Sequence, residues 1–146
     1  MEKLLLPTKS LCKDERQKII VSEENRLKHT AKNINACRVR HYKIDGDIIS
    51  SNDQLKCDYL LINDDKQDAY FIELKGKTDV KESMRQIQAT INLLKGELSG
   101  YIYYGRMVGG RRLHAMATSE LIKCQNEFHK YKGNFKTGTN HMEENI

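Results

Sequence analysis

The sequence predicts an α/β domain in which a mixed β-sheet is flanked by helices. Short apolar runs at 57–62 and 69–75 are rich in β-branched and aromatic residues and are bounded by turn residues, which indicates strands. Between 80 and 95, apolar residues recur every three or four positions, which is typical of an amphipathic helix. The strand expected next, at 100–104, should lie parallel to its partner because a helix intervenes.

Length and composition favour one soluble domain with a charged surface. The chain has 146 residues, 38% of them hydrophobic and 31% charged, and a net charge of +5. This basic excess is compatible with a nucleic-acid partner but does not by itself predict one. The run Leu4-Leu5-Leu6 ends at Pro7 and is too short for a signal peptide or a membrane span, so we expect a cytoplasmic protein with no membrane partner.

The four cysteines are predicted to be free thiols. They form no C-x-x-C pair and have no histidine at zinc-site spacing beside them. Buried free thiols in a reducing compartment are the expected state.

The first half of the chain is predicted to combine one helix with an antiparallel meander. Residues 1–16 are an extension before the domain at 17–132, which opens with a strand at 17–21. Ser22 then caps a helix over 25–33, with Glu23 and Glu24 near the positive end of its dipole. The meander strands are expected at 37–44, 48–49, 57–62 and 69–75, with turns at Asp45-Gly46 and 63–68.

The second half is predicted to be helix, strand and helix. Asp79 and Glu82 suit a capping box for the helix at 80–95, and Gly96 suits its end. After the strand at 100–104 come a glycine- and arginine-rich loop at 105–112, a short strand at 113–117 and a helix at 119–132. The tail at 133–146 lacks apolar periodicity and is expected to be flexible.

Three charged residues stand inside the two most apolar strands. Asp58 lies near the start of one, while Glu73 and Lys75 lie two residues apart at the end of the next. Side chains alternate between the faces of a strand, so Glu73 and Lys75 point the same way, and a hairpin would let Asp58 approach them. Two carboxylates and an ammonium held by a sheet suit metal-assisted phosphodiester hydrolysis.

This pattern, an Asp followed after fourteen residues by Glu-x-Lys, resembles the PD-(D/E)XK nuclease superfamily, which includes restriction endonucleases and Holliday junction resolvases. The resemblance covers roughly residues 17 to 117 by the order of elements. It implies a restriction-endonuclease-like fold. Cys57 stands where the superfamily pattern has its proline, a departure that members often share.

The resemblance also implies roles for these residues. Asp58, Glu73 and the carbonyl of Leu74 would bind Mg²⁺ or Mn²⁺, and Lys75 would hold the attacking water and offset charge in the transition state. Glu73 and Lys75 could alternatively be surface residues of an edge strand, but Phe71 shares their face, which argues against full solvation.

Further candidate site residues depend on the same resemblance, and Glu23, Glu24 and Gln86 each have two possible interpretations. Glu23 or Glu24 could add a carboxylate from the first helix or could be first-turn dipole partners. Gln86 could face the site from the second helix or could be a solvated helix residue. Thr90 occupies the place where some exonuclease relatives carry an aromatic residue, which disfavours a processive exonuclease.

Basic residues near the motif are candidates for phosphate contacts. Arginines of the 105–112 loop could grip phosphates, or the loop could be a hairpin turn with incidental charge. The lysines and arginine after the motif could extend a basic rim or be an ordinary solvated face. The candidates are Lys77, Lys81, Arg85, Arg106, Arg111 and Arg112.

The resulting expectation is a small Mg²⁺- or Mn²⁺-dependent endonuclease that cuts DNA. Its size leaves little room for a sequence-reading domain, so specificity would come from a homodimer, from DNA shape or from a partner protein. Phage defence, mobile-element biology and repair are settings suggested by analogy. The alternative is a catalytically inactive nuclease fold that serves as a nucleic-acid-binding or assembly subunit.

Overall fold

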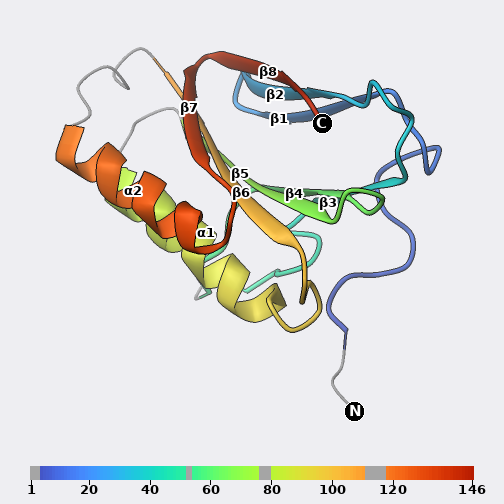
Figure 1. The fold of residues 1–146 in the computed structure, drawn as a ribbon, viewed down its shortest axis with the longest axis horizontal. Helices are drawn as coiled ribbons and strands as arrows, with labels where there is room; N and C mark the ends of the chain where they lie inside the picture. The colour runs from blue at the N-terminus through green and yellow to red at the C-terminus, as the bar shows by residue number, and fades with distance from the viewer. Residues whose placement is uncertain (1–3, 52–53, 76–79, 111–117) are drawn as a thin grey trace.

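The computed structural model describes residues 4–51, 54–75, 80–110 and 118–146. In these residues the chain forms three layers: two helices, a five-stranded sheet and a three-stranded sheet (Figure 1). Several candidates predicted from the sequence lie outside the described residues, so the structure does not bear on them. They are Lys77, Asp79, Arg111, Arg112 and the strand expected at 113–117.

The central five-stranded sheet is mixed, as the sequence predicts. Its strands run in the order β3 (Val39–Lys43), β4 (Tyr59–Asn63), β5 (Asp68–Lys75), β6 (Ile102–Gly109) and β7 (Phe135–Thr139). The first three form an antiparallel meander, whereas β5, β6 and β7 are parallel. Helix α1 (Val80–Leu94) connects β5 to β6, and α2 (Thr118–Lys130) connects β6 to β7. The expected parallel pairing after the helix is therefore confirmed.

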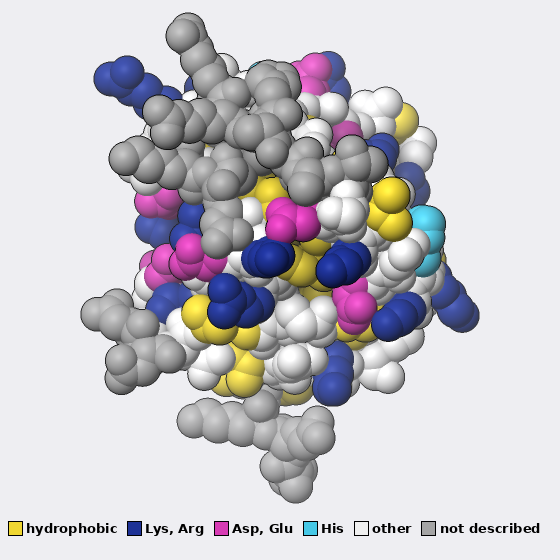
Figure 2. Space-filling view, turned by 90° about the vertical axis from the view of Figure 1, so that its left-hand side faces the viewer, with side chains coloured by type: hydrophobic (Ala, Val, Ile, Leu, Met, Phe, Trp, Pro, Cys, Tyr) yellow, Lys and Arg dark blue, Asp and Glu magenta, His cyan; other side chains and the backbone are white. Residues whose placement is uncertain are grey.

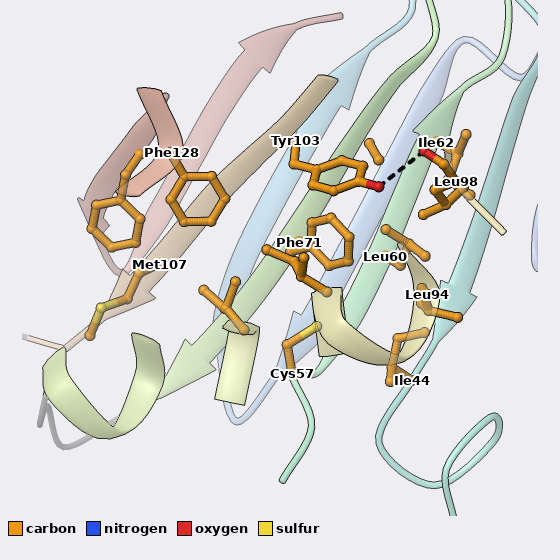
Figure 3. Close-up of a cluster of buried hydrophobic side chains, with 14 of the residues drawn as sticks. Ile44, Cys57, Leu60, Ile62, Phe71, Leu94, Leu98, Tyr103, Met107 and Phe128 are labelled. Atoms are coloured by element: carbon orange, nitrogen blue, oxygen red, sulfur yellow. Dashed lines mark hydrogen bonds between the residues drawn. The ribbon is translucent and has the colours of Figure 1, made fainter. Parts of the chain in front are cut away.

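Both helices cover one face of this sheet. The apolar stripe of α1 supplies Ile87 and Ile91, which are fully buried against the strands together with Phe71 of β5. Figure 3 shows this cluster, in which the Tyr103 hydroxyl donates to the Leu98 carbonyl at 3.0 Å. Because Ile87 and Ile91 are residues that the three-and-four spacing selects, the sequence correctly predicted the buried face of α1.

The other face of the sheet is covered by strands, not by a helix. A second sheet of β1 (Ile19–Glu24), β2 (Leu27–Lys32) and β8 (His141–Asn145) packs there. The helix expected at 25–33 is therefore wrong. Leu27, His29 and Ala31 are buried at every second position, which is the period of a strand, and Asn25 and Arg26 turn the hairpin with φ of 49° and 69°.

Three further expectations need correction. The tail at 133–146 is not loose, because it forms β7 and β8 and buries Phe135 and Ile146. The first part of the expected 105–112 loop is instead the second half of β6. The expected strand at 48–49 is a turn, closed by a bridge between Asp45 and Ile49.

The N-terminal extension packs against the domain. Leu6 is buried in the core, and the Tyr42 hydroxyl donates to the Pro7 carbonyl at 2.8 Å. Leu11 and Glu15 form main-chain hydrogen bonds with β3. This segment therefore covers the outer edge of β3.

The four cysteines are free thiols, as predicted. Three of them are buried, whereas Cys12, in the N-terminal extension, is partly exposed. In the ranges that the structure describes, no helix is long and apolar enough to cross a membrane.

Candidate active site

Asp58 and Glu73 lie next to each other in the central sheet, where β4 begins and β5 ends. Asp58 immediately precedes β4, and the antiparallel pairing of β4 with β5 brings it beside Glu73 near the end of β5. The main-chain N–H of Leu74 donates to Oδ2 of Asp58 at 2.7 Å. This bond fixes the Asp58 carboxylate against β5, so the two acidic side chains occupy one site.

Glu73 is the most perturbed group of the site. Its side chain is 1% exposed. Burial raises the pKa of Glu73 to about 10, and the hydrogen bond with Asp58 and the charge of Asp58 act in the same direction, while Lys75 opposes them. Its Oε2 atom is buried without a hydrogen-bond partner in the described structure. The site thus places the Glu73 carboxyl, with its raised pKa and its unpartnered oxygen, directly beside the Asp58 carboxyl.

These groups open into a polar cavity of about 250 Å³. Lys75 lines the cavity with Asp58 and Glu73, as alternation along β5 predicts. Its ammonium lies 3.9 Å from the Glu82 carboxylate and its side chain is 35% exposed, so this pairing is loose. The remaining lining residues are Asp45, Gln54, Leu55, Lys56 and Gln86.

Helix α1 positions the segment that leads into Asp58. Oε1 of Gln86 accepts the main-chain N–H of Lys56 at 2.7 Å, and Oγ1 of Thr90, one helical turn later, accepts that of Cys57 at 2.8 Å. Of the two interpretations of Gln86, the structure thus favours the one in which it faces the site. Its contact in the described residues is with the main chain before Asp58.

Lys56 and Asp45 are cavity residues that sequence reasoning missed. Lys56 is 8% exposed, and its ammonium donates to the carbonyls of Ser51 and Gln54 and lies 3.8 Å from the Asp45 carboxylate. Asp45 in turn raises the pKa of Glu73 through its charge. Lys56 stands directly before the apolar run at 57–62, and a lysine in that position is the signal that could have drawn attention to it.

The additional carboxylates expected from a first helix do not reach the cavity. Glu23 and Glu24 lie on β1 of the small sheet, and neither lines the site. The Glu23 carboxylate lies 3.9 Å from the Lys28 ammonium instead. Neither interpretation of Glu23 and Glu24 holds, because the segment after Ser22 forms a hairpin and not the helix that both interpretations required.

Arg106 is not placed to contact a nucleic acid, which corrects the prediction for it. Its side chain is 2% exposed and binds the Glu144 carboxylate through Nε at 2.7 Å and Nη2 at 3.0 Å. It also donates to Asn134 and lies 5.4 Å from the ring centres of Tyr70 and Tyr104. Its guanidinium therefore joins β6 to β8 inside the protein.

Lys81 and Arg85 do lie on the surface, on α1 beside a groove between the two helices. The Lys81 ammonium is 3.5 Å from the Glu120 carboxylate of α2. Figure 2 shows this side of the molecule, where basic, acidic and hydrophobic side chains are interspersed. The helical face is consequently not a uniformly basic surface.

The donors at the cavity suit a hard divalent cation. Asp58 and Glu73 offer carboxylate oxygens, and the unpartnered Oε2 of Glu73 is a buried acceptor that a cation would satisfy. The N–H and C=O groups of one strand residue point to the same neighbour, so the Leu74 carbonyl leaves β5 on the side of Asp58. Among the described residues no three Asp, Glu, His or Cys side chains converge as ligands, so water would complete the shell.

Comparison with known proteins does not place the chain in a family. No family model, curated protein or solved structure matches it. The candidate site therefore rests on its own geometry and chemistry.

Proposed function

We propose that this protein is a metal-dependent nuclease that hydrolyses phosphodiester bonds, with DNA as its substrate. The observation that carries the proposal is the convergence of Asp58, Glu73 and Lys75 on one polar cavity. A buried, partly unsatisfied carboxyl pair beside a lysine is unfavourable for folding alone, and perturbed acids of this kind cluster at functional sites.

Each residue has a distinct role in this proposal. Asp58, oriented by the Leu74 N–H, and Glu73 would hold the cation through their oxygens. A bound Mg²⁺ or Mn²⁺ would lower the pKa of a coordinated water and offset negative charge on the phosphate. Lys75 would orient that water and stabilise charge that develops in the transition state. Gln86 and Thr90 would act as positioning residues through the main chain before Asp58.

The order of elements supports the same proposal. An antiparallel meander β3-β4-β5, the helix α1 and the parallel strand β6 follow the order that the sequence resemblance implies. The acidic side chains sit at the start of β4 and the end of β5, as in that pattern. The chain departs from the pattern at its beginning, where a β-hairpin replaces the expected helix.

The direct test is cleavage of linear, circular, nicked and branched DNA with Mg²⁺, with Mn²⁺ and with a chelator. We expect cleavage only with a divalent cation, and no cleavage by Asp58→Ala or Glu73→Ala. Intact DNA under every condition with the wild type, or wild-type cleavage by Glu73→Ala, would contradict the proposal.

Lys75→Ala separates an enzyme from an inactive nucleic-acid-binding subunit. We expect its turnover to fall by orders of magnitude while DNA affinity changes little, because contacts made in the transition state change rate more than binding. Lys95→Ala, an exposed lysine just beyond the far end of α1, is the matched control and should cut at the wild-type rate. A wild type that binds DNA in a salt-sensitive way but never cuts it would favour the binding subunit.

A further inference from the structure

The outer edge of β1 carries main-chain groups that the fold does not use. Among the described strands β1 pairs only with β2. The Asn33 N–H donates to the Lys18 carbonyl at 2.8 Å, so the even-numbered residues of this segment face β2. The N–H and C=O groups of Ile19, Val21 and Glu23 therefore point away from the small sheet.

The side chains of this edge do not protect its centre. Ile19 is 50% exposed and Val21 is 43% exposed. The Gln17 amide donates to the Ile19 carbonyl at 2.8 Å, and the Tyr59 hydroxyl donates to the Glu23 carbonyl at 3.0 Å, so side chains cover both ends. No such bond forms at Val21 in the described structure. An edge strand with exposed apolar side chains and no proline is a template for pairing with another strand.

The charges at the two ends of this edge indicate which strand would pair with it. Lys18 and Glu24 lie three residues on either side of Val21, and neither forms an ion pair with another described residue. Antiparallel pairing with the same strand of a second copy, about a two-fold axis at Val21, would place each Lys18 opposite Glu24 of the partner subunit. Centring the axis on Ile20 or Ser22 would not pair these charges.

We propose that β1 is the interface of a homodimer in which two copies pair antiparallel about Val21. The two small sheets would then form one continuous sheet across the two-fold axis. Main-chain bonds would replace those of the Gln17 amide and the Tyr59 hydroxyl, and cross-strand contact would cover Ile19 and Val21. This interface is independent of the proposed nuclease site, which lies in the cavity between β5 and α1.

The test is a charge-reversal series measured by sedimentation over a range of protein concentrations. Lys18→Glu or Glu24→Lys alone should raise the dimer dissociation constant about tenfold, because two symmetric attractive pairs become repulsive. The double variant Lys18→Glu/Glu24→Lys should restore wild-type association. Lys18 is exposed and Glu24 partly exposed, and circular dichroism at each step verifies that the variants fold.

A main-chain variant tests the same edge independently. Val21→Pro should abolish association, because it removes an N–H that points outward while leaving the bonds to β2 in place. Val21→Thr keeps that N–H and should still associate. A wild type that is monomeric at every concentration would overturn the proposal. The edge of β1 would then be available to pair with an extended segment of another protein. A dimer that is insensitive to Val21→Pro and to both single reversals would also overturn the proposal.

Discussion

Replacing Glu73 with glutamine should stabilise the protein when no metal is present. In the unfolded chain this carboxyl ionises with its ordinary pKa of 4.5, whereas in the folded protein burial and Asp58 raise the pKa to about 10. Its contribution to stability is therefore complete below pH 4.5 and declines as the pH rises toward 10. Glutamine keeps the volume and can donate a hydrogen bond to Asp58 without binding a proton.

The magnitude follows from the separation between the unfolded pKa and the assay pH. Keeping Glu73 protonated at pH 7 costs about 1.4 kcal/mol for each of the pH units above 4.5, or about 3 kcal/mol in total. For a chain of this length, that difference corresponds to about 6–12 °C in Tm. The difference in the free energy of unfolding between Glu73→Gln and the wild type should fall to near zero at pH 4.5.

Thermal and chemical unfolding in chelator, from pH 4.5 to 8, measures this difference. Glu82→Gln makes the same change at a carboxylate that is 52% exposed and should be nearly neutral. Adding Mg²⁺ should stabilise the wild type by about 3 kcal/mol at a hundredfold excess over its Kd, but should not stabilise Glu73→Gln. A Glu73→Gln protein less stable than the wild type at pH 7 in chelator would refute the reasoning, since Glu73 would then be ionised in the fold.

Three further predictions concern the parts of the fold that surround the site. Arg106→Met should lower the free energy of unfolding by about 3–5 kcal/mol in a denaturant titration, because it removes both guanidinium bonds of the partly buried Glu144 carboxylate and leaves that carboxylate with His29 alone. Arg85→Met on the helix surface should change the free energy of unfolding by less than about 0.5 kcal/mol. Burial lowers the pKa of His41 from 6.5 to about 4, so its contribution to stability is present above pH 6.5 and is lost as the pH falls through 4. The free energy of unfolding of the His41→Gln variant should therefore decline by about 3 kcal/mol less than that of the wild type between pH 7 and 4. The same pH profile in both proteins would contradict this prediction. Gly105→Ala should lower Tm with a loss of about 1–3 kcal/mol, because the added Cβ would lie 2.5 Å from the Phe128 ring, and an unchanged Tm would show that α2 can move away.

The local sequence pattern was sufficient to predict the elements whose buried side chains recur with a clear helix or strand period. The strands around 57–62 and 69–75 and the helix over 80–95 form close to the predicted bounds. Asp58, Glu73 and Lys75 reach one cavity because a short hairpin and side-chain alternation leave few other arrangements. These features depend on residues close together in the chain.

Other features depended on partners far away in the sequence. The segment of β2 is predicted as a helix because its polar surface residues hide the alternation, which becomes evident only when the central sheet buries Leu27 and Ala31. The closing strands β7 and β8 have little apolar pattern, and β8 is held by pairing with β2 more than a hundred residues earlier.

Tertiary structure also decided which charged side chains are buried and which are exposed. The sequence predicts a surface position for Arg106, but Glu144, 38 residues later in the chain, makes its burial possible. Lys56 enters the cavity because the carbonyls of Ser51 and Gln54 accept hydrogen bonds from its ammonium. The sequence by itself determined which side chains could perform the chemistry, whereas the tertiary structure decided which charges remain free for it, because only folding brings a distant counter-charge within hydrogen-bond distance.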